Sequence, residues 1–288
     1  MQGRTRTRGD FSPKHAQALA TKARVRCVEV TRDSKFGHLG PDFSAIDLIS
    51  TLYLGILRFP EEDLGHPDRD RFVLSKGHAA LALYTVLIEL GWWQKNQLTR
   101  YGRTGGRLGG HPSSAIQGVE TSTGALGHGL PFAVGCALGS KLHATGSKTF
   151  VLVGDGELQE GSNWEAAMLA SSKQLDDLTV IVDRNRLQQG GSTEAVIRLE
   201  PLKEKWESFG WAVEEINGHD HAAIHECCSR LPLRRSQPTC IIANTVKGKG
   251  VSFMEGKAEW HHKLPSPSEA ESALNELLRG EESHEAIG

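Results

Sequence analysis

Short β-branched segments alternate with longer helical patterns along most of this chain, and this alternation constrains the fold more than any other feature. The strand-like segments are 71–75, 149–153, 178–183, 211–216 and 239–245. The helical patterns are 13–31, 43–57, 78–90, 126–145, 162–174, 200–210 and 220–229. Strands that alternate with helices are joined by right-handed crossovers, which produce a mostly parallel sheet. We therefore predict an α/β fold in which helices cover both faces of a mostly parallel sheet.

Two of these segments indicate where a ligand would bind. Segments 149–153 and 178–183 are apolar without polar alternation, as is typical of strands that are buried on both faces. Ligands of parallel α/β folds bind beyond the carboxyl ends of the strands. Gly-Asp-Gly at 154–156 and Asp-Arg-Asn at 183–185 follow these two strands directly. The sequence thus predicts a site at this edge of the sheet.

The chain reads as one domain with two flanking tails. Residues 13–263 hold all the predicted strands and seven helical patterns, without an internal repeat or a low-complexity linker. Residues 1–12 are predicted to form a disordered N-terminal tail. Residues 264–288 are polar, with a weak helical pattern at 267–279, and are interpreted as a surface or partner-facing tail.

Composition narrows the classes of partner. Lys and Arg number 33 and Asp and Glu 35, so a net charge of -2 gives no electrostatic reason to expect binding to nucleic acid or an anionic membrane. No apolar run is long enough to span a bilayer, and the first nine residues lack the apolar stretch of a signal peptide. The odd number of cysteines without a CxxC pair favours reduced thiols and a cytoplasmic protein. They are Cys27, Cys136, Cys227, Cys228 and Cys240.

Asp155 and Asn185 are the strongest candidates for a metal site. They follow two strands that a single helix connects, so their side chains can converge if the strands are neighbours. Carboxylate and amide oxygens suit Mg²⁺ or Ca²⁺ rather than zinc, and Mg²⁺ normally completes its shell with water and ligand phosphates. Gly154 and Gly156 would let the backbone approach a diphosphate near the start of the next helix. The alternative is a tight turn in which Asp155 merely caps that helix.

Histidines in glycine-containing loops form a second group of candidates. Neutral imidazoles bind hydroxyls and phosphates and transfer protons near pH 7, although a single histidine is more often a surface or core residue. The loop histidines are His38, His78, His111, His128, His261 and His262. The chain has no GxGxxG after a strand, no GxxxxGK[ST] and no GxSxG, which argues against a nicotinamide site, a P-loop and a serine hydrolase.

Taken together, these motifs resemble the transketolase family, specifically its N-terminal diphosphate-binding domain. The resemblance covers about residues 15–265 and follows the order GHLG, DRDRFVLSKGHAA, GGHPS, GVETSTGALGHG, GDGELQEGSNWEAA, DRNRLQQGG, FGWAVEEINGHD and TVKGKGVSF…EWHHK. It implies thiamine diphosphate and Mg²⁺ as cofactors, with Ca²⁺ as a substitute. Mg²⁺ would be held by the side chains of Asp155 and Asn185 and by the carbonyl of Leu187.

The resemblance also implies roles for individual residues. The cofactor would be bound by His78, Gly124, Ala125, Leu126, Gly154, Asp155, Gly156, Glu157, Asn185, Gln189 and His261. His38, His111 and His261 would line the substrate funnel and act in catalysis. Glu160 would lie at the dimer contact that links two active sites, and Glu165 could join that polar network. For both glutamates, and for Gln189, the alternative is an ordinary solvated side chain.

Full-length transketolases continue with a pyrimidine-binding domain and a C-terminal domain, whereas this chain has 288 residues. We therefore expect the first subunit of a split transketolase that forms an α₂β₂ heterotetramer with a second subunit. It would transfer a two-carbon ketol unit from a sugar or sugar phosphate to an aldose. Two alternatives remain: a subunit of another thiamine diphosphate enzyme, such as a 2-oxo-acid dehydrogenase E1 or an enzyme that passes the two-carbon unit to a carrier, and a non-catalytic partner subunit.

Overall fold

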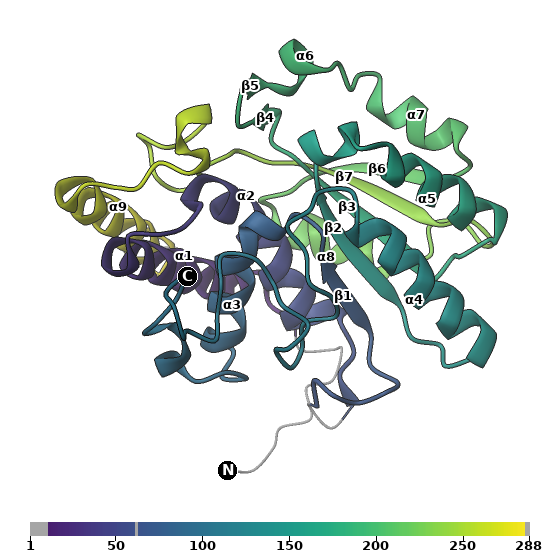
Figure 1. The fold of residues 1–288 in the computed structure, drawn as a ribbon, viewed down its shortest axis with the longest axis horizontal. Helices are drawn as coiled ribbons and strands as arrows, with labels where there is room; N and C mark the ends of the chain where they lie inside the picture. Colours follow the sequence, from purple (N-terminus) through teal and green to yellow (C-terminus); the bar gives the residue numbers. More distant parts are fainter. Residues whose placement is uncertain (1–10, 61–62, 286–288) are drawn as a thin grey trace.

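A five-stranded parallel sheet forms the centre of the computed structural model, which describes residues 11–60 and 63–285 (Figure 1). Its strands are β1 (Arg71–Leu74), β2 (Thr149–Gly154), β3 (Leu178–Arg184), β6 (Ala212–Asn217) and β7 (Thr239–Asn244). The order is β1-β2-β3-β7-β6, and every neighbouring pair is parallel. The predicted mostly parallel sheet is confirmed.

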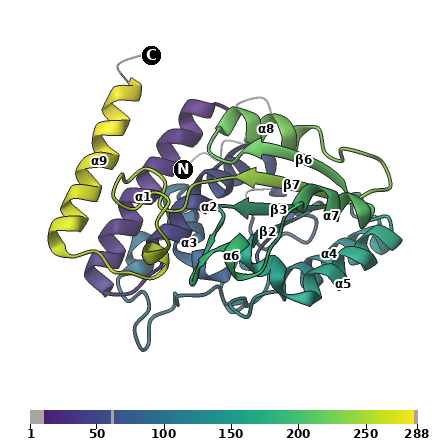
Figure 2. The same ribbon diagram turned by 90° about the horizontal axis from the view of Figure 1, so that it is seen from above.

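Helices cover both faces of this sheet (Figures 1 and 2). One face carries α1 (Pro13–Ser34), α2 (Leu39–Thr51), α3 (Ala80–Glu89) and α8 (His221–Ser229). The other face carries α4 (Gly129–His143), α5 (Gly161–Ser172) and α7 (Leu202–Ser208). The period of two along the strands divides the core accordingly. Leu152 packs in the first apolar cluster, while its neighbours Val151 and Val153 pack in the second.

Shorter elements complete the chain between these helices and strands. They are the π-helical turn η1 (Leu52–Ile56), the 3₁₀ turns η3 (Gly77–Ala79), η4 (Lys95–Leu98), η5 (Gly156–Gln159) and η6 (Ala258–His261), the antiparallel pair β4 (Leu187–Gln188) and β5 (Gly191–Ser192), and α6 (Thr193–Val196).

The start of α2 differs from the sequence prediction. We predict a helix from residue 43, but α2 begins at Leu39. Pro41 is tolerated there because the N–H groups of the first helical turn have no partner within the helix. Gly40 is required by close packing, since a Cβ at this position would lie 2.6 Å from the carbonyl oxygen of Trp260. A contact between residues so distant in sequence leaves no local signal.

The C-terminal segment forms helix α9 (Pro267–Glu285), which runs alongside α1 (Figures 1 and 2). Ala270, Ala273 and Leu277 are buried and belong to the same apolar cluster as the inner side of α1. Much of this polar segment therefore packs onto the domain through one apolar stripe. The proposed domain boundaries stay predictions, and most of the predicted tail at 1–12 lies outside the described residues.

Two further expectations concern the state of the cysteines and the presence of membrane-spanning helices. All five cysteines are free; Cys136 is half-buried and the other four are buried. Within the described residues, no helix combines the length and apolar character needed to cross a membrane.

Candidate active site

The carboxyl ends of β2 and β3 meet at one edge of the sheet. Gly154 is paired with Asp183 in the register, and the N–H of Asp155 donates to the Asp183 carbonyl oxygen at 3.2 Å. The strand adjacency that the sequence prediction required is therefore present. It brings Asp155 and Asn185, the two predicted metal ligands, to the same edge of the sheet, each directly after the end of one of these neighbouring strands.

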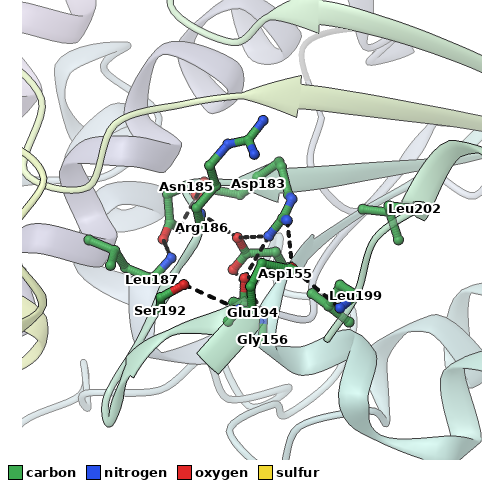
Figure 3. A network of polar contacts seen from close by, with 12 residues as sticks. Asp155, Gly156, Asp183, Asn185, Arg186, Leu187, Ser192, Glu194, Leu199 and Leu202 are labelled. Carbon is green, nitrogen blue, oxygen red and sulfur yellow. Dashed lines mark hydrogen bonds and ion pairs between the residues drawn. The ribbon is translucent and has the colours of Figure 1, made fainter. Parts of the chain in front are cut away.

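Asp155 is held firmly in place and is 2% exposed. Its Oδ1 accepts from the Gly156 N–H at 2.8 Å, and its Oδ2 accepts from the Arg186 N–H at 2.5 Å (Figure 3). The buried Arg184 guanidinium lies 3.1 Å from the same Oδ2 and also pairs with Glu194. These contacts orient the carboxylate toward the 185–187 segment.

The electrostatics at Asp155 favour an added cation. Burial and the nearby charge of Asp183 raise the pKa of Asp155 above its usual value, although Arg184 acts in the opposite direction. The surroundings of Asp155 therefore stabilise its negative charge less well than water does. A divalent ion beside it would restore the balance, so this donor fits a hard metal ion.

Asn185 and Leu187 lie next to Asp155 in a tight turn (Figure 3). The Asn185 side chain donates from Nδ2 to Asp183 Oδ1 at 3.1 Å and accepts at Oδ1 from the Leu187 N–H at 3.1 Å. Leu187 opens the β4–β5 pair directly after this turn. Over residues 11–60 and 63–285, no group of three or more His, Cys, Asp or Glu side chains is arranged for a metal. The predicted ligand set of Asp155, Asn185 and the Leu187 carbonyl contains only one such side chain, that of Asp155.

Glu157 connects three loops around the site. Its buried carboxylate accepts from the Ser75 hydroxyl, from the Gly127 N–H at 3.0 Å and from the Gly154 N–H at 3.0 Å. Burial raises the pKa of this carboxyl, while those hydrogen bonds oppose the rise. Both oxygens of Glu157 thus bind donors of the chain itself, so this residue holds the loops of the site in position.

The 124–126 loop faces the same side as His111. Gly124 has φ +134°, and a Cβ there would lie 2.9 Å from the His111 ring. The loop is tied to β1 because the Thr123 hydroxyl donates to the Leu74 carbonyl oxygen at 2.7 Å. Only glycine at 124 combines this backbone conformation with close approach to the imidazole. Ala125 is exposed and Leu126 half-buried beside it.

Four of the predicted histidines form a cluster. The ring of His38 lies 5.9 Å from His78, 6.1 Å from His111 and 6.0 Å from His261, measured between centroids. His78 and His261 stack at 4.9 Å. His128 is instead exposed at the start of α4, where its Nδ1 lies 3.0 Å from the Leu126 carbonyl oxygen. The cluster joins loops from four widely separated parts of the chain.

Burial makes three members of this cluster poor bases. It lowers the pKa of His38 to about 4 and that of His261 to about 3, and it holds the pKa of His78 well below its usual value. The positive charges of Lys76 and Lys247 add to the effect. These imidazoles are therefore neutral near pH 7 and can act as hydrogen-bond donors or acceptors.

Two buried lysines complete the site, and neither was predicted from the sequence. Lys76 Nζ lies 2.7 Å from Asp183 Oδ2. Lys247 Nζ lies 3.1 Å from His261 Nδ1 and, among the described residues, has no carboxylate within ion-pair distance. Burial, with the charge of Lys76, lowers the pKa of Lys247 to about 8. The signal was available, since both lysines follow the carboxyl end of a strand in a glycine-containing loop.

The remaining predicted residues point to solvent in the single chain. Glu160, at the N-cap position of α5, and Glu165, within that helix, are exposed. Gln189, in the turn between β4 and β5, is exposed as well. Their predicted contacts with a cofactor or with another subunit stay predictions.

Comparison with known proteins relates this arrangement to one family. The family model described as "Transketolase, thiamine diphosphate binding domain" matches residues 15–273. One subunit of the apulose-4-phosphate transketolase of Phocaeicola vulgatus is 43% identical over 256 residues, which cover 89% of this chain and 91% of the relative. The 6-deoxy-6-sulfo-D-fructose transketolase subunit SqwG of a Clostridium species is 37% identical, with 84% and 88% covered. The crystal structure of Campylobacter jejuni transketolase superposes with a TM-score of 0.83 at 29% identity, covering 91% of this chain and 42% of that chain.

Proposed function

This chain belongs to the transketolase family, and we propose that it is the thiamine diphosphate-binding subunit of a split transketolase. With a second subunit it would transfer a two-carbon ketol unit from a ketose to an aldose acceptor. Relatives of matching length are named as subunits of transketolases, which implies a further subunit, whereas the chain covers only 42% of a whole transketolase from Campylobacter jejuni. We further propose an α₂β₂ assembly.

One observation carries the proposal: the buried Lys247 ammonium has no anionic partner in the described part of the chain. A buried unpaired cation is costly unless a ligand supplies the opposite charge. The carboxylate of Asp155, which contributes to the electrostatic field at Lys247, needs a cation for the reason given above. A magnesium diphosphate satisfies both demands at once, because it presents a metal to Asp155 and phosphate oxygens to Lys247.

The residues present fit this group. Asp155, Asn185 and the Leu187 carbonyl would hold Mg²⁺, and the Gly156 backbone and His78 would bind the diphosphate. Once bound, thiamine diphosphate supplies the nucleophilic carbon that accepts the two-carbon unit. His38, His111 and His261 would bind the hydroxyl and carbonyl oxygens of the donor and orient it, and the neutral His38 and His261 would do so without adding charge.

The partner and the substrates follow as further proposals. We propose a ketose or ketose phosphate as donor, because relatives are named for apulose 4-phosphate and for 6-deoxy-6-sulfo-D-fructose. Glu160 and Glu165 are exposed on or beside α5, as a role at the contact with another subunit requires. A cytoplasmic location is proposed on the ground that all five cysteines are free.

The test is a ketol-transfer assay with thiamine diphosphate and Mg²⁺, on this chain alone and together with its second subunit. A panel of ketose phosphates would be compared with pyruvate as donor. Activity only in the mixture, and only with ketoses, supports the proposal. Activity with pyruvate alone would favour another thiamine diphosphate enzyme, and failure of the mixture to bind the cofactor would favour a non-catalytic subunit.

Substitution of Asp155 tests its proposed role as a metal ligand. Asp155→Ala should abolish Mg²⁺-dependent binding of thiamine diphosphate, measured by calorimetry, because it removes the carboxylate ligand. Asp68→Ala is the matched control, since Asp68 is exposed just before β1, at the amino end of the strand and thus away from the site at the carboxyl ends. Equal loss of binding in both variants would contradict the assignment.

A further inference from the structure

A buried polar network lies behind the site, on the side of α2. The carboxylate of Asp47 is 2% exposed and accepts two hydrogen bonds from Arg24 of α1, at 2.9 and 2.6 Å. His219 Nδ1 lies 2.7 Å from Asp47 Oδ2. His219 occupies the turn between β6 and α8, so this contact joins α1 and α2 to the carboxyl edge of the sheet.

The other ring nitrogen of His219 binds the backbone. The Val246 N–H donates to His219 Nε2 at 2.8 Å. A ring nitrogen that accepts from an N–H carries no proton, and a ring nitrogen beside a carboxylate donates one. The geometry therefore defines a neutral imidazole with its proton on Nδ1, and Asp47 selects this tautomer.

Val246 immediately precedes Lys247, so this hydrogen bond acts on the segment that carries the lysine. The same segment is anchored before and after it, by the Thr245 hydroxyl donating to Asp183 and by the Gly248 N–H donating to the Gly40 carbonyl oxygen at 3.0 Å. Between these two anchors, His219 is the partner of the Val246 N–H, while the Val246 and Lys247 carbonyl oxygens accept from the Lys249 N–H at 3.2 Å and the Gly256 N–H at 2.9 Å. Lys247 Nζ then reaches His261 Nδ1 at 3.1 Å.

We propose that His219 is a positioning residue for the diphosphate site. Through the Val246 N–H it sets the backbone from which the Lys247 ammonium enters the site, and Asp47 holds the imidazole in the form that can accept this bond. The inference rests on the proposed function, because Lys247 is assigned there to the diphosphate. It adds a chain of contacts from α1 and α2 to that lysine.

His221 provides a matched control within the same network. It is 4% exposed, its Nδ1 lies 2.8 Å from the Thr51 hydroxyl, and its Nε2 lies 3.5 Å from Asp47 Oδ1. It shares Asp47 with His219, but its polar contacts within the described part of the chain do not extend to the 245–248 segment. A general disturbance of the network would therefore appear in both histidine variants, and a positioning effect only in His219 variants.

The experiment compares His219→Phe, His219→Gln and His221→Phe in the complex with the second subunit. Calorimetry measures the Kd for thiamine diphosphate with Mg²⁺, and thermal unfolding measures stability. We expect His219→Phe to raise the Kd about tenfold or more, because the part-buried Val246 N–H loses its acceptor. His219→Gln, whose amide oxygen can replace Nε2 as the acceptor, should restore the Kd to within about threefold of wild type. His221→Phe should lower thermal stability without changing the Kd.

Two further measurements keep this inference separate from the proposed function. Amide hydrogen exchange on the chain alone should accelerate at Val246 in His219→Phe but not in His219→Gln, whether or not a cofactor binds. Nitrogen NMR of the wild-type chain should show His219 protonated on Nδ1 only, which tests the geometry even if a variant fails to fold. If the wild-type complex binds no cofactor, the proposed function is overturned. The role of His219 is overturned by any of three results: an unchanged Kd in His219→Phe, an equal rise of the Kd in His221→Phe, or a proton on Nε2 of His219 instead of Nδ1.

Discussion

Lys76→Met offers the sharpest test of the buried charges at the carboxyl edge of the sheet. The side chains of Lys76 and Asp183 are 2% and 0% exposed, and their charged atoms lie 2.7 Å apart. Methionine preserves much of the length of lysine but leaves the Asp183 carboxylate buried without its cation. Removing one member of a buried ion pair costs about 3–5 kcal/mol of folding free energy.

Other donors limit the loss. In the variant Asp183 would still accept from Ser44 at 2.8 Å, from Asn185 at 3.1 Å and from the Thr245 hydroxyl. We therefore expect a value near the lower end, about 3 kcal/mol. At roughly 2 °C per kcal/mol for a large domain, the melting temperature should fall by about 6 °C at pH 8.

The destabilisation caused by Lys76→Met should become smaller as the pH falls. In the wild type, burial would raise the pKa of Asp183, but the charge and hydrogen bond of Lys76 hold it below its usual value. Its contribution to stability is thus present above the unfolded value of about 3.9 and is lost as the pH falls through the lower folded value. Without Lys76, burial dominates and raises this pKa, so the variant is penalised at high pH and relieved as the pH falls.

Thermal unfolding of wild type and variant at pH 8 and pH 5 measures this effect. The gap in melting temperature should be smaller at pH 5, and a second change, Asp183→Asn, should recover at least half of the loss at pH 8, because no charge is then left unpaired. A gap of the same size at both pH values, or a loss below about 1 kcal/mol, would refute the reasoning.

Three further predictions follow from burial. Leu277→Ala on α9 should lower the free energy of unfolding, measured in urea, by about 2–3 kcal/mol. Leu278→Ala, at a site that is 46% exposed, should change that free energy by less than about 0.5 kcal/mol. Equal effects would mean that α9 does not pack as described. The pKa values of His38 and His261 are lowered to about 4 and about 3. The stability that this contributes is present above the unfolded value of about 6.5 and is lost as the pH falls toward 4. Replacing both histidines by Asn should therefore make the urea midpoint depend less on pH between pH 7 and pH 4.5. An unchanged slope would contradict the burial of this pair. Titration with a thiol reagent should modify at most about one cysteine in the native chain, the half-buried Cys136, and all five in denaturant; rapid reaction of several native thiols would count against the packing.

The sequence predicted the parts of the fold that depend on local pattern. Uninterrupted apolar segments at 149–153 and 178–183 indicated buried parallel strands, and the crossover rule indicated their direction. The polar residues after these strands therefore had to meet at one edge, and Asp155 and Asn185 do so. The motif resemblance, in turn, identified the family and named the four histidines that cluster.

What the sequence could not predict depends on contacts between distant residues. The early start of α2 needs the fit of Gly40 against Trp260, and the packing of α9 needs its apolar stripe to meet α1. Both helices have weak local signals for these boundaries. Their position is determined by tertiary packing, which outweighs intrinsic helix propensity.

The charge states in the site are the clearest case. A lysine in a glycine loop has an ordinary pKa until the fold buries it, and nothing within a few residues of Lys76 or Lys247 indicates which group each will meet. The fold pairs Lys76 with Asp183, 107 positions away, and leaves Lys247 beside a neutral His261. Local sequence thus determined which residues reach the carboxyl edge of the sheet, whereas burial and long-range contacts determined which of them stay charged, neutral or unpaired there.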